Sequence, residues 1–198
     1  VLLALGISSM HVDRAERGFS YRQEGPLDMR MGPDAPRTAA ELIAQSSEDE
    51  LARILQRYGD ERFARRIARA VVHAHPAPTT TTELAAIVRD AIPAAARRSG
   101  GHPATRTFQA LRIAVNGELE AVEQVLPTAI ARLAPDGVLV VLAYHSLEDR
   151  LVKRAFTDAA TGCICPPDLP VCACGRVPVV DHLVRRPERP GEDEVATN

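Results

Sequence analysis

The sequence predicts an α/β fold in which a parallel sheet is interrupted by an inserted all-helical domain. Two continuous apolar runs, Val1–Leu5 and Val138–Tyr144, lack polar alternation, which is typical of strands buried on both faces of a parallel sheet. Between them, residues 38–99 carry helical signals throughout. Strands that alternate with helices favour an α/β architecture, and ligands of such folds bind beyond the carboxyl ends of the strands.

Length and composition are those of an ordinary water-soluble domain. The chain has 198 residues, 45% hydrophobic and 25% charged, enough for one large domain or one domain with an insertion. The formal net charge is -2, so any nucleic-acid contact must come from local basic patches. No apolar run is long enough to span a membrane, and the first residues lack the basic region of a signal peptide. Because a buried-type strand starts at residue 1 without a Met, we expect the chain to be a piece of a longer protein.

The first strand leads into the small-residue loop Gly6-Ile7-Ser8-Ser9, which suits close approach of backbone to a cofactor. Residues 10–31 have no clear periodicity, and a long irregular stretch of this kind is usually a functional loop or a linker. The mixture of charged and apolar side chains over residues 28–31 predicts a partly buried, ordered loop.

The predicted helical domain begins with capping signals. Thr38–Glu41, Ser47–Glu50 and Thr80–Glu83 each match the capping-box pattern, in which a hydroxyl and a Glu three residues later satisfy the first backbone amides of a helix. Gly59 is the expected C-cap of the second helix, and Asp60 is expected to begin the third. The Pro- and Thr-rich residues 73–82 predict a linker before a fourth helix over Glu83–Arg98, interrupted near Pro93. Gly100 is expected to end the helical block.

Four arginines of the third helix, Arg62, Arg65, Arg66 and Arg69, recur at three- and four-residue steps and therefore share one face. Two interpretations stay open for this face: a solvated set of salt bridges, or a contact with RNA phosphates.

The chain then returns to the α/β pattern. A long helix is expected over Thr105–Leu126 from its apolar stripe, a short one from Pro127, and a turn at Asp136-Gly137 before the second strand. Ser146 is expected to cap the following helix, with Asp149 at the third helical position. His145, Ser146 and Glu148 would then lie at the carboxyl end of a buried strand, either as functional groups or only as caps and loop hydrogen bonds.

All four cysteines lie within a dozen residues, in the Cys-rich loop 163–175: Cys163, Cys165, Cys172 and Cys174. Two C-x-C pairs with six residues between them can place four thiolates around one tetrahedral Zn²⁺, although the spacing is tighter than the usual C-x₂₋₄-C. The sequence leaves zinc and free thiols as alternatives. The polar, Pro-rich stretch Arg185–Asn198 predicts an extended tail.

Four long motifs together carry a family resemblance. They are AERGFSYRQEGPLDMRM (Ala15–Met31), YGDERFARRIARAVV (Tyr58–Val72), GHPATRTFQALRIAVNGELE (Gly101–Glu120) and YHSLEDRLVKR (Tyr144–Arg154). The chain resembles the bacterial small-subunit ribosomal RNA cytosine-N4 methyltransferases (the RsmH/MraW family) over nearly its whole length.

The resemblance implies an incomplete class I, Rossmann-like methyltransferase core that uses S-adenosyl-L-methionine as the methyl donor. The implied domains are core 1–31, helical insertion 32–104 and core 105–198. The implied substrate is a cytidine in the decoding region of 16S rRNA, within the small ribosomal subunit, and the implied location is the cytoplasm. The family's Gly-rich cofactor loop would precede residue 1, and its C-terminal basic segment would follow residue 198. The oligomeric state is left open, with a homodimer as one alternative.

The resemblance also implies roles for individual residues. Ala4, Gly6 and His11 occupy positions that contact the cofactor, but the family pattern has Asp at residue 4 and Gln at residue 11. His11 still offers a hydrogen bond, whereas Ala4 cannot accept one, and losing a hydrogen bond to a charged group costs about 1.5–3 kcal/mol.

The implied catalytic groups are His145, Ser146, Glu148 and Asp149. Arg106, Asn116, Asp28 and Arg30 are expected to bind the substrate. Arg106 and Asn116 would orient the RNA or the loop that carries Ala4, with helix-terminal and core hydrogen bonding as an equal alternative. Two other functions stay open: a non-catalytic RNA-binding homologue, favoured by Ala4, and a zinc-stabilised interaction module.

Overall fold

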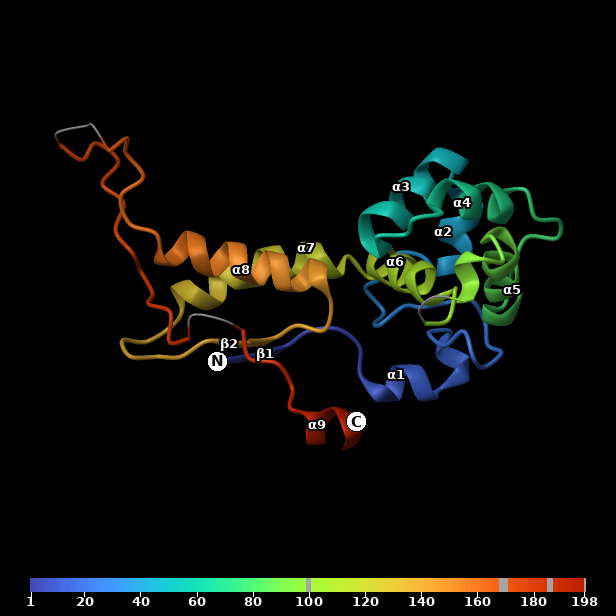
Figure 1. Cartoon of the computed structure of the whole chain (residues 1–198), viewed down its shortest axis with the longest axis horizontal. Coiled ribbons are helices and arrows are strands. Elements are labelled where there is room, and N and C mark those ends of the chain that lie inside the picture. Colours follow the sequence, from blue (N-terminus) through green and yellow to red (C-terminus); the bar gives the residue numbers. More distant parts are fainter. Residues whose placement is uncertain (99–100, 168–170, 185–186, 198) are drawn as a thin grey trace.

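A computed structural model describes residues 1–98, 101–167, 171–184 and 187–197. A helical body occupies one end of the molecule, and a small α/β layer with two strands and two long helices occupies the other (Figure 1). The predicted end of the helical block at Gly100 lies outside the described residues, as do residues 168–170 of the Cys-rich loop and parts of the tail.

The two apolar runs form one sheet, as predicted. Strand β1 (Leu2–Ala4) pairs in parallel with β2 (Val140–Leu142), with Leu3 opposite Val141, and the Leu5 amide extends the ladder by donating to the Leu142 carbonyl at 3.0 Å. Because the strands are parallel, their carboxyl ends lie at the same edge.

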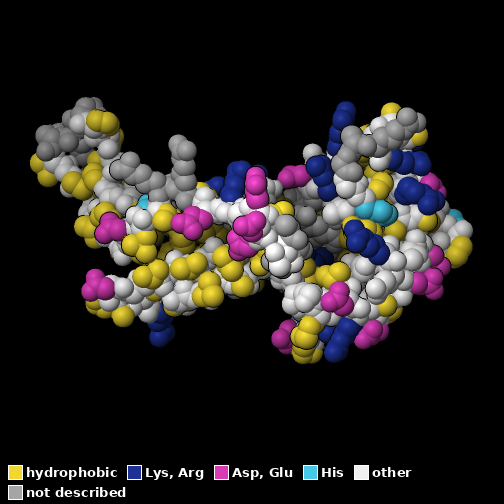
Figure 2. Space-filling view, turned by 60° about the horizontal axis from the view of Figure 1, so that its bottom comes forward, with side chains coloured by type: hydrophobic (Ala, Val, Ile, Leu, Met, Phe, Trp, Pro, Cys, Tyr) yellow, Lys and Arg dark blue, Asp and Glu magenta, His cyan; other side chains and the backbone are white. Residues whose placement is uncertain are grey.

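The prediction that both strands are buried on both faces is wrong for the described residues. Leu2 is 64% exposed and Val140 is 47% exposed, whereas their neighbours Leu3 and Val141 on the opposite face are half-buried. Helices α7 and α8 lie over one side of the strand pair (Figure 1). Hydrophobic side chains gather on the half of the molecule that carries the strands (Figure 2), because the sequence has a two-faced apolar pattern and only one face is covered.

Three helices of the helical body start with the predicted capping boxes, and all three boxes are confirmed. Helices α2 (Ala39–Gln45), α3 (Glu48–Gly59) and α5 (Thr81–Ala91) each start after a hydroxyl residue that accepts from the amide three positions on, while the Glu at that third position accepts from the cap amide. Helix α4 (Ala64–Val72) and helix α6 (Thr105–Asn116) complete the body.

Helix α6 packs across α3, and α4 packs on both α3 and α5. The shared core contains Leu42, Leu51, Leu55, Ile67, Val71, Leu84, Val88, Phe108 and Leu111, joined by Leu27 and Met29 from the long loop. The loop over residues 28–31 is therefore ordered and anchored in the core, as its composition predicts.

The C-cap prediction for α3 is wrong by one residue, and the start of the third helix by four. Gly59 is the last helical residue, Asp60 adopts the left-handed conformation (φ 46°), and α4 starts only at Ala64. A side chain at Gly59 would place its Cβ 2.5 Å from the Arg106 carbonyl oxygen. The glycine is therefore required by the close crossing of α3 and α6, rather than by backbone conformation.

The predicted long helix over Thr105–Leu126 is two helices. Gly117 (φ 60°) separates α6 from α7 (Glu118–Ala131), and Pro127 lies inside α7 instead of starting a new helix. The apolar residues keep a helical spacing across the break, so periodicity alone did not reveal it. The interruption near Pro93 is confirmed, because α5 ends at Ala91 and a 3₁₀ turn follows at Ala96–Arg98.

The remaining α-helices of the described chain are α1, α8 and α9. Helix α1 (Ser9–Asp13) and a 3₁₀ turn (Ala15–Arg17) lie in the long loop, and α8 (Ser146–Ala160) packs on α7. Helix α9 (Glu192–Thr197) shows that the predicted extended tail is partly helical. No helix among the described residues is both long and apolar enough to cross a membrane.

Candidate functional site at the carboxyl ends of the strands

The loops that follow β1 and β2 meet at the carboxyl edge of the sheet. Gly6 has φ 84°, a left-handed conformation that L side chains rarely adopt. A Cβ at this position would lie 3.3 Å from the Tyr144 ring and 3.8 Å from Glu148 Oε1. The predicted cofactor loop and the predicted catalytic segment therefore lie next to each other, although they are more than 130 residues apart in sequence.

His145, not Ser146, caps helix α8, so the capping prediction for Ser146 is wrong. The Glu148 amide donates to His145 Nδ1 at 3.4 Å, and Glu148 Oε2 accepts from the amides of Tyr144 at 2.9 Å and His145 at 3.4 Å. This is a capping box in which an imidazole replaces the usual hydroxyl. Ser146 is the first helical residue, with an exposed side chain, and Asp149 is at the fourth position and accepts from Lys153 Nζ at 2.6 Å.

The capping box buries an ionisable pair. Glu148 is 1% exposed, and its Oε1 lies 3.2 Å from His145 Nε2, which is buried and has no well-aligned hydrogen-bond partner among the described residues. Since Nδ1 accepts a hydrogen bond, the neutral ring carries its proton on Nε2, facing this carboxylate. Burial acts to raise the pKa of Glu148, but the adjacent imidazole and the two amide donors outweigh it and lower the pKa.

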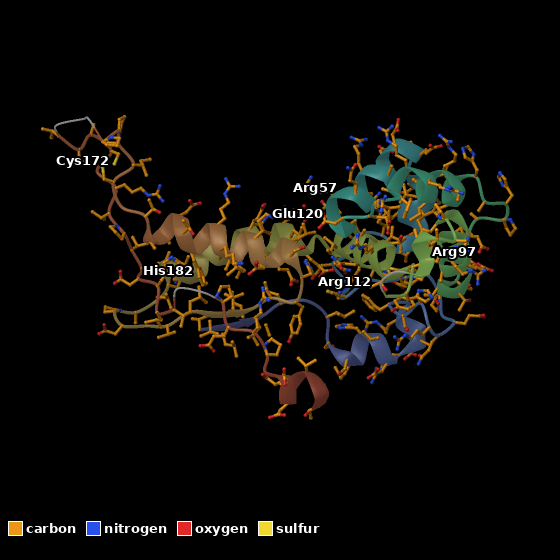
Figure 3. All side chains as sticks on the ribbon, viewed as in Figure 1. Arg57, Arg97, Arg112, Glu120, Cys172 and His182 are labelled. Atoms are coloured by element: carbon orange, nitrogen blue, oxygen red, sulfur yellow. The ribbon has the colours of Figure 1, made fainter. Side chains whose placement is uncertain are left out.

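A second, partly buried ion pair lies at the α6–α7 junction, and the sequence patterns do not predict it. Arg112 Nε and Nη2 donate to the two carboxylate oxygens of Glu118 at 2.8 Å and 3.0 Å, and the side chains are only 13% and 11% exposed. Figure 3 places Arg112 where the helical body meets the α/β layer. Burial raises the pKa of Glu118 against the attraction of Arg112, and the charge of Glu148 raises it further. The signal available in the sequence was a pair of opposite charges flanking Gly117 within an apolar stripe.

The residues assigned to the substrate are engaged in structural hydrogen bonds. Asn116 bonds the backbone of Met29 and Met31, and Arg106 donates to the Asp60 carbonyl at 2.8 Å, just beyond the end of α3. These are the core and helix-terminal bonds of the alternative interpretation. Asp28 and Arg30 form a two-bond ion pair with each other, at 2.8 and 2.9 Å, which lowers the pKa of Asp28. Contact of any of these four residues with RNA stays a prediction.

The three cofactor positions fit a bound S-adenosyl-L-methionine unequally. Gly6 provides a close backbone approach, and within the described chain no protein group accepts a hydrogen bond from the Gly6 or Ile7 amides. His11 Nδ1 lies 2.9 Å from Ser8 Oγ, and its ring packs on Phe19. Ala4, exposed at the end of β1, offers only a methyl group. The turn over residues 6–8 therefore suits one polar edge of the cofactor, whereas Ala4 does not.

The four cysteines lie away from this edge, at the tip of an arm that extends from the end of α8 (Figure 3). Hydrogen bonds from the backbone of Arg176 and Ile164 lower the pKa of Cys174 to about 6. Any metal bound there would be remote from the strand edge.

Comparison with known proteins gives one consistent result. The family model described as the MraW methylase family matches residues 1–198. The chain is 54% identical to Ribosomal RNA small subunit methyltransferase H of Heliobacterium modesticaldum and 52% identical to the protein of the same name from Symbiobacterium thermophilum, in both cases over its full length. A Mycobacterium protein with this name is 52% identical.

The chain covers 64%, 63% and 53% of these three relatives, respectively. It therefore spans just under two thirds of the length of the first two. The match of the family model over every residue shows that the chain belongs to the MraW methylase family.

Proposed function

We propose that the protein to which this chain belongs transfers a methyl group from S-adenosyl-L-methionine to N4 of a cytidine in the decoding region of 16S rRNA. The observation that carries the proposal is the close approach of Gly6 to the Tyr144–Glu148 segment at the carboxyl edge of a parallel sheet. Ligands of α/β folds bind at this edge. Family membership and the names of the relatives support the reaction class.

The cofactor supplies an electrophilic methyl group on a sulfonium. Methyl transfer would join this carbon to N4 in exchange for its bond to sulfur, which would keep the electron pair, and N4 would lose one proton. The amine lone pair is delocalised into the pyrimidine ring, so alignment and hydrogen-bond acceptors for its N–H groups provide most of the acceleration. The base must be unpaired or extruded from the RNA to reach the site.

The contacts of the segment divide its residues into two roles. Glu148 is buried and its oxygens are occupied by backbone amides, so we assign it and His145 to positioning the strand-to-helix turn. Ser146 is exposed at the first helical position, and its hydroxyl is the acceptor we assign to the N4 amine. Asp149, paired with Lys153, lies one residue beyond the capping box.

RNA binding is assigned to the helical body, whose helices α2 to α5 lie within the proposed insertion, residues 32–104. Arg62, Arg65 and Arg66 are exposed, whereas Arg69 is exposed but paired with Glu48 at 3.2 Å. Three guanidinium groups on one side of the body provide the local positive patch that phosphate contact requires in a chain of net charge -2. The small ribosomal subunit in the cytoplasm is the proposed partner and location.

Methyl transfer to small ribosomal subunits that lack the modification tests the proposal, with the full-length protein and nucleoside mass spectrometry for N4-methylcytidine. Product at one decoding-region cytidine is the expected result, and no product with correctly folded protein would contradict the proposal. His145→Ala should lower the rate. His145→Asn keeps a capping side chain, so it should be more stable than His145→Ala. A rate that is still below that of the natural protein would give the imidazole a role beyond capping. The exposed His182→Ala variant is the control.

A second candidate is a homologue that binds RNA without catalysis, and the exposed methyl group of Ala4 at the strand edge favours it. Calorimetry with S-adenosyl-L-methionine on the full-length protein distinguishes the two. Binding by the natural protein supports the enzyme, recovery only in Ala4→Asp indicates an impaired enzyme, and binding by neither supports the second candidate. Leu2→Asp, on the same exposed face of β1, controls for the added charge.

A further inference from the structure

The cysteines converge in space more closely than an unconstrained loop requires. The Sγ atoms of Cys163, Cys165, Cys172 and Cys174 all lie within 4.8 Å of one another, although the two pairs are separated by six residues. Figures 1 and 3 place this cluster at the far end of the arm, opposite the helical body.

The spacing of the sulfur atoms matches tetrahedral coordination. Zinc–thiolate bonds are about 2.3 Å long, and in a regular tetrahedron this length separates each pair of sulfurs by about 3.8 Å. Cys172 Sγ and Cys174 Sγ are 3.6 Å apart, and Cys174 Sγ and Cys163 Sγ are 3.8 Å apart. Both distances are far too long for a disulfide bond, which is about 2.05 Å.

Backbone donors surround the sulfurs as they do in metal–thiolate sites. The Cys165 amide lies 3.4 Å from Cys163 Sγ, and the Ala173 amide lies 3.4 Å from Cys165 Sγ. Such N–H donors orient ligands and balance the negative charge of thiolates. Gly175 follows the last cysteine with φ 62°, which turns the chain back toward α8 at no steric cost.

The arm has no apolar core, within its described residues, that would hold the cysteines together without a metal. Ile164 is 61% exposed and Val171 is 76% exposed, although both lie beside ligand candidates. At the base of the arm, the Val179 amide donates to the Ala159 carbonyl at 2.9 Å, and Arg176 donates to the Asp158 carbonyl. A cross-link at the tip would complete a closed loop whose base is already fastened to the end of α8.

We propose that the four cysteines bind one zinc ion in a structural site that stiffens this arm. Four thiolates leave no open coordination position, which distinguishes a structural zinc from a catalytic one. Soft sulfur ligands in a tetrahedron select zinc or iron over magnesium and calcium. The inference does not depend on the proposed methyl transfer, because the cluster lies apart from the strand edge.

Metal analysis of protein purified in zinc-containing buffer, with reductant and without chelator, tests the proposal. We expect one zinc per chain, released when an organomercurial titrates the thiols, and a cobalt(II)-substituted form with the visible bands of a tetrahedral thiolate complex. Free reactivity of all four thiols, two disulfides, or stoichiometric iron in place of zinc would each overturn the assignment.

The variants separate ligand loss from general damage. Cys172→Ser/Cys174→Ser should lose the zinc and the cobalt bands, whereas Val171→Ser, at an exposed position next to a ligand, should keep both. Far-ultraviolet circular dichroism should be equal for the two variants, because the helices lie outside the loop. Zinc retained by the double variant would also reject the site.

Discussion

The side-chain amide of Asn116 holds Met29 in the left-handed backbone conformation. Asn116 Nδ2 donates to the Met29 carbonyl at 2.8 Å, and its Oδ1 accepts from the Met31 amide at 2.7 Å. Met29 has φ 62° and a fully buried side chain. This conformation costs about 1–2 kcal/mol for a residue other than glycine, and the two bonds offset that cost. The loop that carries Asp28 and Arg30 is thus tied to the α6–α7 junction.

Replacing Asn116 with Ala should destabilise the chain by about 1–3 kcal/mol, because the Met31 amide and the Met29 carbonyl lose a common partner in a partly buried position. Urea denaturation followed by circular dichroism measures the effect. Gln124→Ala removes a similar amide from the exposed side of α7 and should change stability by less than about 0.5 kcal/mol. Equal effects of the two substitutions would contradict the role given to Asn116.

The contribution of Glu148 to stability should depend on pH. Its pKa is lower in the folded chain than the usual 4.5, so the folded state favours the ionised carboxylate. That contribution is fully present above the unfolded pKa and is lost as the pH falls through the folded pKa. The difference in unfolding free energy between the natural chain and Glu148→Gln should therefore be greatest near neutral pH and shrink below about pH 4.5.

Ser146→Ala provides the comparison for that experiment. The serine lies in the same turn but makes none of the hydrogen bonds that Glu148 makes. The change in the free energy of unfolding caused by Ser146→Ala should therefore be small and independent of pH. A constant effect of Glu148→Gln from neutral to acid pH would show that the carboxylate charge is not what stabilises the turn.

The Arg112–Glu118 pair should show strong coupling. Removing either partner leaves an uncompensated charge in a site about one tenth exposed, and breaking such a pair costs about 3–5 kcal/mol. Arg112→Leu and Glu118→Leu should each lower the free energy of unfolding. The sum of these two losses should exceed the loss in the double variant, because the double variant leaves no unpaired charge. A double-mutant cycle measures the coupling free energy. Additive effects would indicate that the two side chains act independently despite their two hydrogen bonds.

Gly59→Ala should destabilise the helical body by about 1–3 kcal/mol, although Ala is the better helix former, because the new methyl group would meet the Arg106 carbonyl at 2.5 Å. Thermal or urea denaturation measures this effect. Gly32→Ala is the matched substitution, since a Cβ there has no neighbour within 4 Å, and it should be neutral or slightly stabilising. A stabilising Gly59→Ala would contradict the close crossing of α3 and α6.

The basic patch formed by Arg62, Arg65 and Arg66 predicts a change in salt dependence. Replacing these three residues with Ala in the full-length protein should weaken binding to the small ribosomal subunit. The magnitude of the slope of log affinity against log salt should fall by about 0.7–0.9 for each phosphate that the variant no longer neutralises. Arg69→Ala is the comparison, because its guanidinium is paired with Glu48. An unchanged slope in the triple variant would remove the patch from the RNA interface.

Structural features that depend on a few consecutive residues are the ones that the sequence predicts most accurately. The three capping boxes at Thr38, Ser47 and Thr80 formed as predicted because each involves only four consecutive residues. The cap of α8 was misassigned because hydroxyl residues are the usual N-caps, whereas here an imidazole takes that place beside a buried Glu148. Capping preferences describe single residue types, so they do not include the effect of the buried Glu148 carboxylate beside His145.

Sequence patterns do not predict which distant segments come into contact. The close approach of Gly59 to Arg106 and the clamp between Asn116 and Met29 join residues far apart in sequence, and no periodicity reports such pairs. The break at Gly117 was missed because the apolar stripe continues across it with unchanged spacing.

The α/β class, the helical body and the family could all be predicted from the sequence, because apolar runs, capping motifs and long family motifs are properties of contiguous residues. The folded structure was needed to show which faces of the strands are covered, which glycines are required by close packing, and which charges are buried together. Burial and electrostatic pairing depend on the distances between segments, and those distances exist only once the chain has folded.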